Sequence, residues 1–144
     1  IASNLKYIII RPHNIYGPNQ KNHFVPEFVQ KCKKNKITLE GWKNTRSWLF
    51  IDDCCYAIEK ILETKKAVNE IINIGSNDEK KVIDVAKVIL KELKINKKII
   101  KRPAPTGSAI RRKPDISKLK KLINWYPKTT LEDGIKITLK NIKL

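Results

Sequence analysis

The hydrophobic positions along the chain fall into short apolar runs separated by segments with helical spacing. Residues 6–11, KYIIIR, form a near-continuous apolar run, which predicts a strand buried on both faces of a parallel sheet covered by helices. Further short runs predict four more strands, at 37–39, at 46–51, at 70–74 and from Ile99 onward. Strands that alternate with helices predict the α/β class.

Helices are predicted between these strands. Pro26 suits the first position of a helix, because its ring fixes the backbone angle that a helix needs. Asp52 is expected to cap the next helix. The apolar side of that helix would consist of Cys55, Ile58, Ile61 and Leu62. Apolar residues spaced by three and four positions predict the clearest helix over 82–93.

Polar residues mark two further helix starts in the C-terminal part. Asp115 is expected to cap a short helix that ends near Leu122. Thr130 and Asp133 have the spacing of a capping box, in which side chains satisfy free backbone N–H groups at a helix start. The last helix is expected to continue to the end of the chain.

The length and the cysteines narrow the class of protein. A chain of 144 residues suits one domain. No apolar run reaches the ~18–20 residues of a membrane helix, and no signal-peptide pattern is present, so no membrane partner is expected. Cys32, Cys54 and Cys55 fit neither a disulfide framework nor metal-ligand spacing, which favours the cytoplasm and predicts no metal site. Cys54 and Cys55 are interpreted as a structural pair of small apolar residues.

The sequence contains no methionine and carries a net charge of +17. The missing methionine suggests that the sequence is part of a longer protein. A high positive charge is typical of partners such as nucleic acid. However, lysines are spread along the whole chain, which favours a generally solvated surface and makes nucleic acid an unlikely partner.

The arginines are more informative than the lysines, because there are only five and Arg offers a planar fork for phosphate or carboxylate. Together with Asn14, which follows the first strand, Arg46, Arg111 and Arg112 could hold a diphosphate beyond the strand ends. Alternatively, Arg46 pairs with Asp52 or Asp53, and the other two arginines are solvated. His13 and His23 lie in polar loops, where each could contact a ligand or serve as an ordinary surface residue.

Several segments together carry a family resemblance. Residues 11–18, RPHNIYGP, resemble the RPxNxYGP segment of the NAD-dependent epimerase/dehydratase family, the extended short-chain dehydrogenases. Similar segments follow in the family's order at 23–28 (HFVPEF), 45–53 (TRSWLFIDD), 73–75 (NIG), 111–118 (RRKPDISK), 125–128 (WYPK) and 131–135 (LEDGI). The UDP-glucuronate decarboxylase and UDP-glucose 4-epimerase types are the most similar forms.

The resemblance implies the C-terminal part of an extended short-chain dehydrogenase fold. The last strands of a Rossmann-type parallel sheet would lie at 1–18 and 52–78. A small mixed α/β substrate-binding lobe would comprise 19–51 and 79–144. The glycine-rich NAD loop and the catalytic Tyr-x-x-x-Lys pair are expected to be missing, so NAD would be bound mainly by a missing N-terminal part. The chain alone would then be inactive, with no catalytic residue of its own.

The resemblance also implies roles for individual residues. Pro12 and His13 would contact NAD near the nicotinamide. A nucleotide-diphosphate sugar would be held by Asn14, His23, Leu39, Glu40, Arg46, Arg111 and Arg112. Leu39 and Glu40 would lie against the base, where the family commonly has an aromatic residue at the second position, so a nucleotide other than uridine stays open. Asp53 would be structural or orient a loop.

The function expected from these observations is substrate binding. The chain would be the substrate-binding part of an NAD-dependent sugar-nucleotide epimerase, dehydratase or decarboxylase, which would serve nucleotide-sugar or surface-polysaccharide biosynthesis as a homodimer. The alternative is a small basic nucleic-acid-binding α/β module. The sequence lacks the interleaved aromatic and basic stripe of single-strand binders, which disfavours that alternative.

Overall fold

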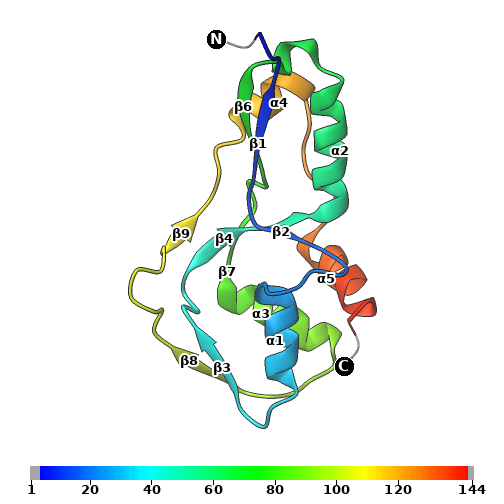
Figure 1. The fold of residues 1–144 in the computed structure, drawn as a ribbon. Helices are drawn as coiled ribbons and strands as arrows, with labels where there is room; N and C mark the ends of the chain where they lie inside the picture. The colour runs from blue at the N-terminus through cyan, green and yellow to red at the C-terminus, as the bar shows by residue number, and fades with distance from the viewer. Residues whose placement is uncertain (1–3, 143–144) are drawn as a thin grey trace.

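The computed structural model describes residues 4–142. Figure 1 shows an elongated molecule with an upper and a lower part, joined by short strands at mid-height. Parallel strand pairs occur in both parts and helices pack against them, so the predicted α/β class is confirmed. Within the described residues, every helix is too short or too polar to span a bilayer.

The upper part is built on the parallel strands β1 (Ile8–Pro12) and β6 (Glu70–Ile74). Helices α2 (Ile51–Leu62) and α4 (Ser117–Ile123) pack against them, and the short 3-10 helix η1 (Lys65–Ala67) leads from α2 to β6. Its buried core consists of Leu49, Cys54, Ala57, Ile61, Ala67, Ile72, Ile74, Ile116, Leu119 and Trp125.

One face of the β1–β6 sheet is not covered within the described residues. Ile72 on β6 is buried against α2 and α4, whereas Ile9 and its register partner Ile71 are 44% and 41% exposed. The expectation of a first strand buried on both faces is therefore wrong for residues 4–142, because both helices pack on the same side.

The lower part combines helices α1 (Phe24–Cys32), α3 (Val82–Glu92) and α5 (Leu131–Lys140) with the parallel strands β3 (Ile37–Glu40) and β8 (Ile99–Arg102). Its core is aliphatic and aromatic, with Tyr16, Val25, Phe28, Val29, Ile37, Leu39, Phe50, Val85, Ala86, Ile89 and Ile135 among its buried members.

Short strands join the two parts. β2 (Ile15–Tyr16) runs parallel to β5 (Leu49–Phe50). β4 (Thr45–Ser47) is the middle strand of a second sheet, antiparallel to β7 (Glu79–Lys81) and parallel to β9 (Arg111–Arg112). This second sheet brings together residues that lie more than sixty positions apart in the sequence, which creates the site described below.

The single strand predicted at 46–51 is wrong. Trp48 separates β4 from β5, and α2 already begins at Ile51. The apolar run is continuous, but its two halves pair with different sheets. The break cannot be recognised from local hydrophobicity, because it depends on partners from distant parts of the chain.

The start and the buried face of α2 also differ from the prediction. Phe50 occupies the N-cap position without a side-chain hydrogen bond, so Asp52 is an exposed first-turn residue and not the cap. The buried positions of α2 are Asp53, Cys54, Ala57 and Ile61. Cys55 is exposed and Leu62 is 67% exposed, so the interpretation of both adjacent cysteines as apolar packing residues is wrong for Cys55.

The other helices follow the sequence more closely. The spacing correctly predicts α3, and the capping box of α5 is confirmed, since Thr130 Oγ1 accepts a hydrogen bond from the Asp133 N–H at 3.1 Å. α1 begins at Phe24, which places Pro26 in the first turn and not at the first position. α5 ends at Lys140, and the predicted end at Leu144 lies outside the described residues.

Residues near Asp115 connect the lower part back to the upper one. Ile116 and not Asp115 occupies the N-cap position of α4, so the predicted cap is wrong by one residue. Asp115 Oδ1 still accepts the Ser117 N–H at 2.8 Å, which satisfies a free backbone donor at the start of the helix. Ile116, Leu119 and Trp125 then pack in the upper part, although 79–144 was assigned to the substrate-binding lobe. The division into 1–18, 19–51, 52–78 and 79–144 otherwise stays a prediction, and residues 1–3 and 143–144 of it lie outside the described chain.

Candidate functional site

Two neighbouring cavities lie at the junction of the upper and lower parts. The first, which we call the strand-end cavity, has a volume of about 430 Å³ and is lined by Pro12, His13, Asn14, Ile15, Gln20, His23, Ser47 and Arg112. The second, the β3 cavity, measures about 270 Å³, and its lining includes Asn14, Phe24, Lys31, Leu39, Glu40, Asn44, Arg46 and Trp48. Asn14 lines both cavities.

Asn14 connects the end of β1 to strands β4 and β5 by hydrogen bonds. The His13 N–H donates to the Ile74 carbonyl at 2.8 Å and extends the β1–β6 pairing by one residue. Asn14 then adopts a left-handed backbone with φ of 50°, a conformation that Asn tolerates better than most residues. Its Nδ2 donates to the Ser47 carbonyl at 2.9 Å, and its own carbonyl accepts the Leu49 N–H at 3.2 Å. These bonds hold the amide of Asn14 rigidly between the two cavities.

Arg46 and Arg112 are register partners on the parallel strands β4 and β9. Arg46 lines the β3 cavity and Arg112 lines the strand-end cavity, so one guanidinium belongs to each. Burial lowers the pKa of Arg46, and the positive charge of Arg112 lowers it further. Two guanidinium groups that repel each other beside an opening would be stabilised by a bound anion.

Backbone carbonyls hold the Arg46 side chain in place. Its Nη1 donates to the Thr45 carbonyl at 2.7 Å, and its Nη2 donates to the Ala109 carbonyl at 2.8 Å. Among the described residues it forms no ion pair with Asp52 or Asp53, so the alternative pairing considered from the sequence is wrong. The guanidinium is thus preorganised without a permanent carboxylate partner.

Arg111 is held away from both cavities. Its Nε and Nη2 donate to the two carboxylate oxygens of Glu79 at 2.8–3.0 Å, and Glu79 also accepts from the Thr45 hydroxyl. Neither cavity includes Arg111 in its lining. The structure therefore brings Asn14, Arg46 and Arg112 together, but it does not bring Arg111 to them. The alternative of a merely solvated Arg111 is also wrong, because the side chain is ion-paired.

The Glu79 contacts predict an acid-sensitive stability. Hydrogen bonds from Arg111 and Thr45 lower the pKa of Glu79 from 4.5 to about 2. A carboxyl group with a lowered folded-state pKa contributes stability above its unfolded pKa, and this contribution is lost as the pH falls toward the folded value. Between pH 4.5 and 2 the midpoint of urea unfolding should therefore fall more steeply for the wild type than for Glu79→Gln. Parallel curves for the two proteins would contradict this assignment.

The two histidines and Pro12 all line the strand-end cavity. His13 is held there by a close packing arrangement, since a Cβ on Gly75 would lie 2.5 Å from Pro114 Cγ and 3.3 Å from His13 Cβ. The absence of a side chain at Gly75 lets the segment after β9 pack beside the end of β1. Pro12 and His13 form one edge of the cavity, and His23 at the start of α1 contributes another.

Leu39 and Glu40 line the β3 cavity at the end of β3, next to Gly41. Gly41 has a φ of 59°, the left-handed conformation that favours glycine, and the chain turns there toward Asn44. Leu39 is buried, whereas Glu40 is exposed. Thus every residue expected to bind the substrate, apart from Arg111, lines one of these two adjacent cavities.

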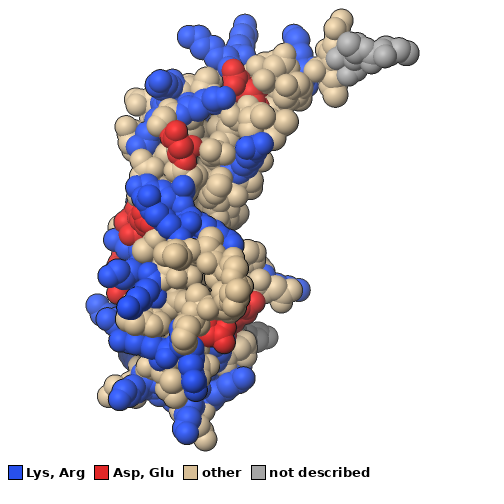
Figure 2. Space-filling view, turned by 90° about the vertical axis from the view of Figure 1, so that its left-hand side faces the viewer, with Lys and Arg blue, Asp and Glu red and all other residues tan. Residues whose placement is uncertain are grey.

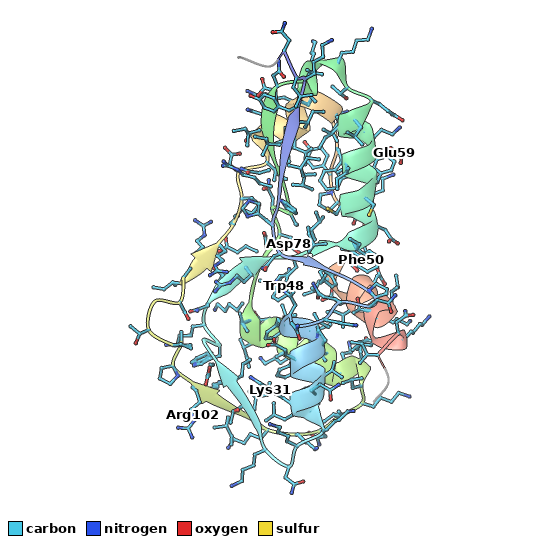
Figure 3. All side chains as sticks on the ribbon, viewed as in Figure 1. Lys31, Trp48, Phe50, Glu59, Asp78 and Arg102 are labelled. Atoms are coloured by element: carbon cyan, nitrogen blue, oxygen red, sulfur yellow. The ribbon has the colours of Figure 1, made fainter. Side chains whose placement is uncertain are left out.

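Several lining residues were not anticipated from the sequence. Gln20, Ser47, Lys31, Asn44 and Trp48 belong to this group. Ser47 directly follows Arg46, and its fully buried hydroxyl has no hydrogen-bond partner in the described chain. Figure 3 shows Trp48 at the junction of the two parts, above α1, with its ring centroid 5.4 Å from that of Phe24. Ser47 and Trp48 directly follow Arg46 in the sequence, and this proximity is the one signal that could have indicated them.

A third cavity of about 420 Å³ adjoins Trp48 on segments 76–80 and 126–132. It contains no arginine, and its charged residues Asp78, Lys80, Lys128 and Glu132 are of mixed sign. The formal charges of its lining residues cancel, whereas each of the first two cavities has a net formal charge of +1 with the histidines neutral. No group of three or more metal-ligating side chains occurs in residues 4–142.

The expectation that the sequence lacks a Tyr-x-x-x-Lys spacing is wrong, because Tyr56 and Lys60 have it. Both residues lie on α2, and neither lines the two cavities. Lys60 Nζ is paired with Glu63 at 2.7 Å, which raises the pKa of the lysine. Tyr56 is 45% exposed. This pair is therefore a surface feature and does not supply an acid or base to the candidate site.

The described side chains suit binding better than bond-breaking chemistry. Three side-chain amides, two guanidinium groups and two imidazoles are among the groups that line the two cavities. Such donors are suited to phosphate oxygens and sugar hydroxyls.

Comparison with known proteins identifies the family of this chain. The family model described as GDP-mannose 4,6 dehydratase matches residues 2–138. UDP-glucuronic acid decarboxylase 4 of Arabidopsis thaliana is 32% identical over 99% of this chain and 33% of its own length. A UDP-N-acetyl-alpha-D-glucosaminuronate decarboxylase of Bacillus cytotoxicus is 32% identical over 94% of this chain and 46% of its own length. The chain thus spans a third to a half of these relatives.

Solved structures match the same region. The dTDP-glucose 4,6-dehydratase of Bacillus anthracis in complex with NAD superimposes with a TM-score of 0.80 and 34% identity, over 93% of this chain and 43% of that one. The UDP-glucuronic acid 4-epimerase of Bacillus cereus, in complex with UDP-glucuronic acid and NAD, gives a TM-score of 0.79 and 26% identity over 93% and 44%. The chain therefore belongs to the NAD-dependent epimerase/dehydratase family of sugar-nucleotide enzymes.

Proposed function

We propose that this chain is the substrate-binding part of an NAD-dependent sugar-nucleotide epimerase, dehydratase or decarboxylase. The observation that carries the proposal is the convergence of Asn14, Arg46 and Arg112 on two adjacent cavities. The two arginines would bind the diphosphate, and Asn14 would orient it between them. A ligand that extends from the diphosphate in both directions would place its sugar in the strand-end cavity and its nucleoside in the β3 cavity.

NAD is the cofactor that family membership implies. When bound, it would accept a hydride from the sugar and later return it. Pro12 and His13 offer one edge of the strand-end cavity for contact with the nicotinamide, while the 144-residue sequence contains no glycine-rich dinucleotide loop. The chain's own contribution would therefore be to hold the sugar beside the cofactor. By itself it should give no turnover.

The reaction, the assembly and the location in the cell belong to the same proposal. The relatives differ in reaction, since they include decarboxylases, dehydratases and epimerases. They also differ in the nucleotide named, since both UDP and dTDP occur, while the family model is described by a GDP-sugar. A homodimer and a role in polysaccharide biosynthesis stay predictions. Three free cysteines suit the reducing cytoplasm expected from the sequence.

The alternative of a nucleic-acid-binding module rests on surface charge. Figure 2 shows lysine and arginine over both parts of the viewed face, with few acidic residues between them. The basic residues are scattered and do not form one groove, so this view favours a generally basic surface over a defined nucleic-acid track.

Calorimetry can separate the two functions. The purified chain would be titrated with UDP-glucuronic acid, with GDP-mannose and with duplex DNA at 50 and 200 mM salt. We expect saturable binding of at least one sugar nucleotide at both salt concentrations, and DNA binding that disappears at the higher one. Tight DNA binding with a steep log-linear salt dependence, and no heat with either sugar nucleotide, would overturn the proposal.

A further inference from the structure

Asn44 is a buried polar residue in the turn between β3 and β4, where it is 8% exposed. Its N–H donates to the Gly41 carbonyl at 2.9 Å, and its own carbonyl accepts the Val82 N–H at 2.9 Å. The side chain is confined as well, since a Cβ on Gly41 would lie 3.0 Å from Asn44 Nδ2. The turn is therefore tied to the start of α3, and the amide of Asn44 projects from a fixed backbone.

The amide of Asn44 and the guanidinium of Arg46 meet at the same acceptor. Asn44 Nδ2 donates to the Ala109 carbonyl at 3.3 Å, and Arg46 Nη2 donates to it at 2.8 Å. A backbone carbonyl oxygen has two lone pairs, so these two donors occupy both. Asn44 thus helps to hold the group that holds Arg46.

The Ala109 carbonyl belongs to a loop with few other attachments. Residues 103–110 connect β8 to β9 along the left side of the molecule in Figure 1. Within residues 4–142, every hydrogen bond between this loop and the rest of the chain comes from residues 44–46. The other two of these bonds reach the Ile110 carbonyl, from the Thr45 N–H at 2.9 Å and from Arg46 Nη1 at 3.3 Å. The position of the Ala109 carbonyl therefore depends strongly on Asn44.

The same loop forms part of the candidate site. Ala104, Pro105 and Ser108 line the β3 cavity. A displacement of the loop would therefore change both the cavity wall and the support of Arg46. A guanidinium without this support would have to be ordered when a ligand binds, which costs conformational entropy.

The guanidinium of Arg46 can be held by carbonyls and still bind a phosphate. It donates to the carbonyls of Thr45, Ala109 and Ile110. A guanidinium has five N–H donors, so these three bonds leave two donors for an anionic ligand. Support by the loop and binding of a diphosphate are therefore compatible.

We propose that Asn44 is a positioning residue of the candidate site, which holds the Ala109 carbonyl and thereby fixes the orientation of the Arg46 guanidinium. This inference rests on the proposed function, in which Arg46 binds the diphosphate. Asn44 itself does not touch the ligand. Its contribution to ligand affinity passes through Arg46, so the effects of replacing the two residues are not additive.

A double-mutant cycle measures this coupling. UDP-glucuronic acid and GDP-mannose would be titrated by calorimetry into the wild type, Asn44→Ala, Arg46→Ala and the double variant. We expect Asn44→Ala to weaken binding of the sugar nucleotide that the wild type binds by about fivefold, as for one hydrogen bond. In the Arg46→Ala background the same change should weaken binding by less than about twofold, because no guanidinium is left to position.

Asn73→Ala is the matched control. Asn73 Nδ2 also donates to a distant carbonyl, that of Asp115 at 3.1 Å, but Asn73 lines neither cavity. Its replacement should leave the affinity within about twofold of the wild-type affinity. Thermal unfolding would show whether each variant is folded. If Asn44→Ala does not fold, Asn44→Ser takes its place in the cycle, since it also removes the amide but leaves a smaller void.

Other outcomes separate the possible failures. Equal losses of affinity in both backgrounds would mean that Asn44 contacts the ligand directly, which overturns the positioning role. Lower thermal stability with unchanged affinity, or failure of both Asn44 variants to fold, would mean that Asn44 serves the fold alone, and this also overturns it. These results leave the proposed function intact. Absence of binding of both sugar nucleotides by the wild type would overturn the proposed function, and this inference with it.

Discussion

Replacing Arg112 with alanine is expected to weaken binding of a sugar nucleotide by about 1.5–3 kcal/mol, the effect of losing a charge-assisted hydrogen bond to phosphate. Arg112 is exposed and lines the strand-end cavity, so its removal should leave the fold intact. Arg46→Ala should have an effect of similar size on affinity. It should also lower stability, because Arg46 holds the carbonyls of Thr45 and Ala109. Calorimetric titration with UDP-glucuronic acid and GDP-mannose measures the loss.

The neighbouring arginine provides a matched control. Arg111→Ala removes the same charge one residue away, but that guanidinium is engaged by Glu79 and lines neither cavity. The affinity of the Arg111→Ala variant for the ligand should stay within about twofold of the wild-type affinity. We expect this small difference to come from the change in net charge alone. If Arg111→Ala and Arg112→Ala weaken binding equally, the distinction between the two side chains is wrong, and a general electrostatic attraction explains the binding.

The second large effect, on stability, concerns Asp53, which holds the segment that precedes α5. Asp53 is buried, and its two carboxylate oxygens accept the backbone N–H groups of Lys128 and Thr129 at 3.1 and 2.9 Å. Asp53→Asn replaces one acceptor with an amino group that faces a donor and also removes the charge. We expect the free energy of unfolding to fall by about 2–4 kcal/mol. Urea denaturation followed by circular dichroism measures the change.

Asp52 is the control for this experiment. It precedes Asp53 in the same helical turn and is exposed, so Asp52→Asn makes the same chemical change without removing a buried contact. Its effect should stay within about 0.5 kcal/mol, as for ordinary surface substitutions. Equal destabilisation by the two variants would mean that the negative charge at the start of α2, and not the bond to 128–129, accounts for the effect.

Local signals in the sequence predicted some elements well. The apolar spacing of α3 and the Thr130–Asp133 capping box depend on residues three or four positions apart, and both occur as expected. Asp53 was expected to be structural or to orient a loop, and its bonds to residues 128–129 fit that expectation. These features succeed because the interacting groups are close in sequence or belong to a recognisable segment.

Features that depend on distant partners were not predictable in the same way. Arg111 and Arg112 are adjacent and chemically identical, and only their strand pairing separates them. In β9 one residue meets Glu79 and the other the strand-end cavity, since successive side chains of a strand point to opposite faces. The break at Trp48 has the same origin, because β4 and β5 join different sheets. Nothing in the local sequence indicates these partners.

Locating the bound ligand on the chain would test the proposed substrate site most directly. A ¹⁵N-labelled sample titrated with GDP-mannose, and separately with UDP-glucuronic acid, would be followed through its assigned amide resonances. We expect saturable shifts at Asn14, Ser47 and Arg112, at the end of β1 and across β4 and β9, with little change on α2. Shifts confined to the cavity beside Tyr126 and Lys128, or scattered over the surface lysines without saturation, would contradict a substrate site between Arg46 and Arg112.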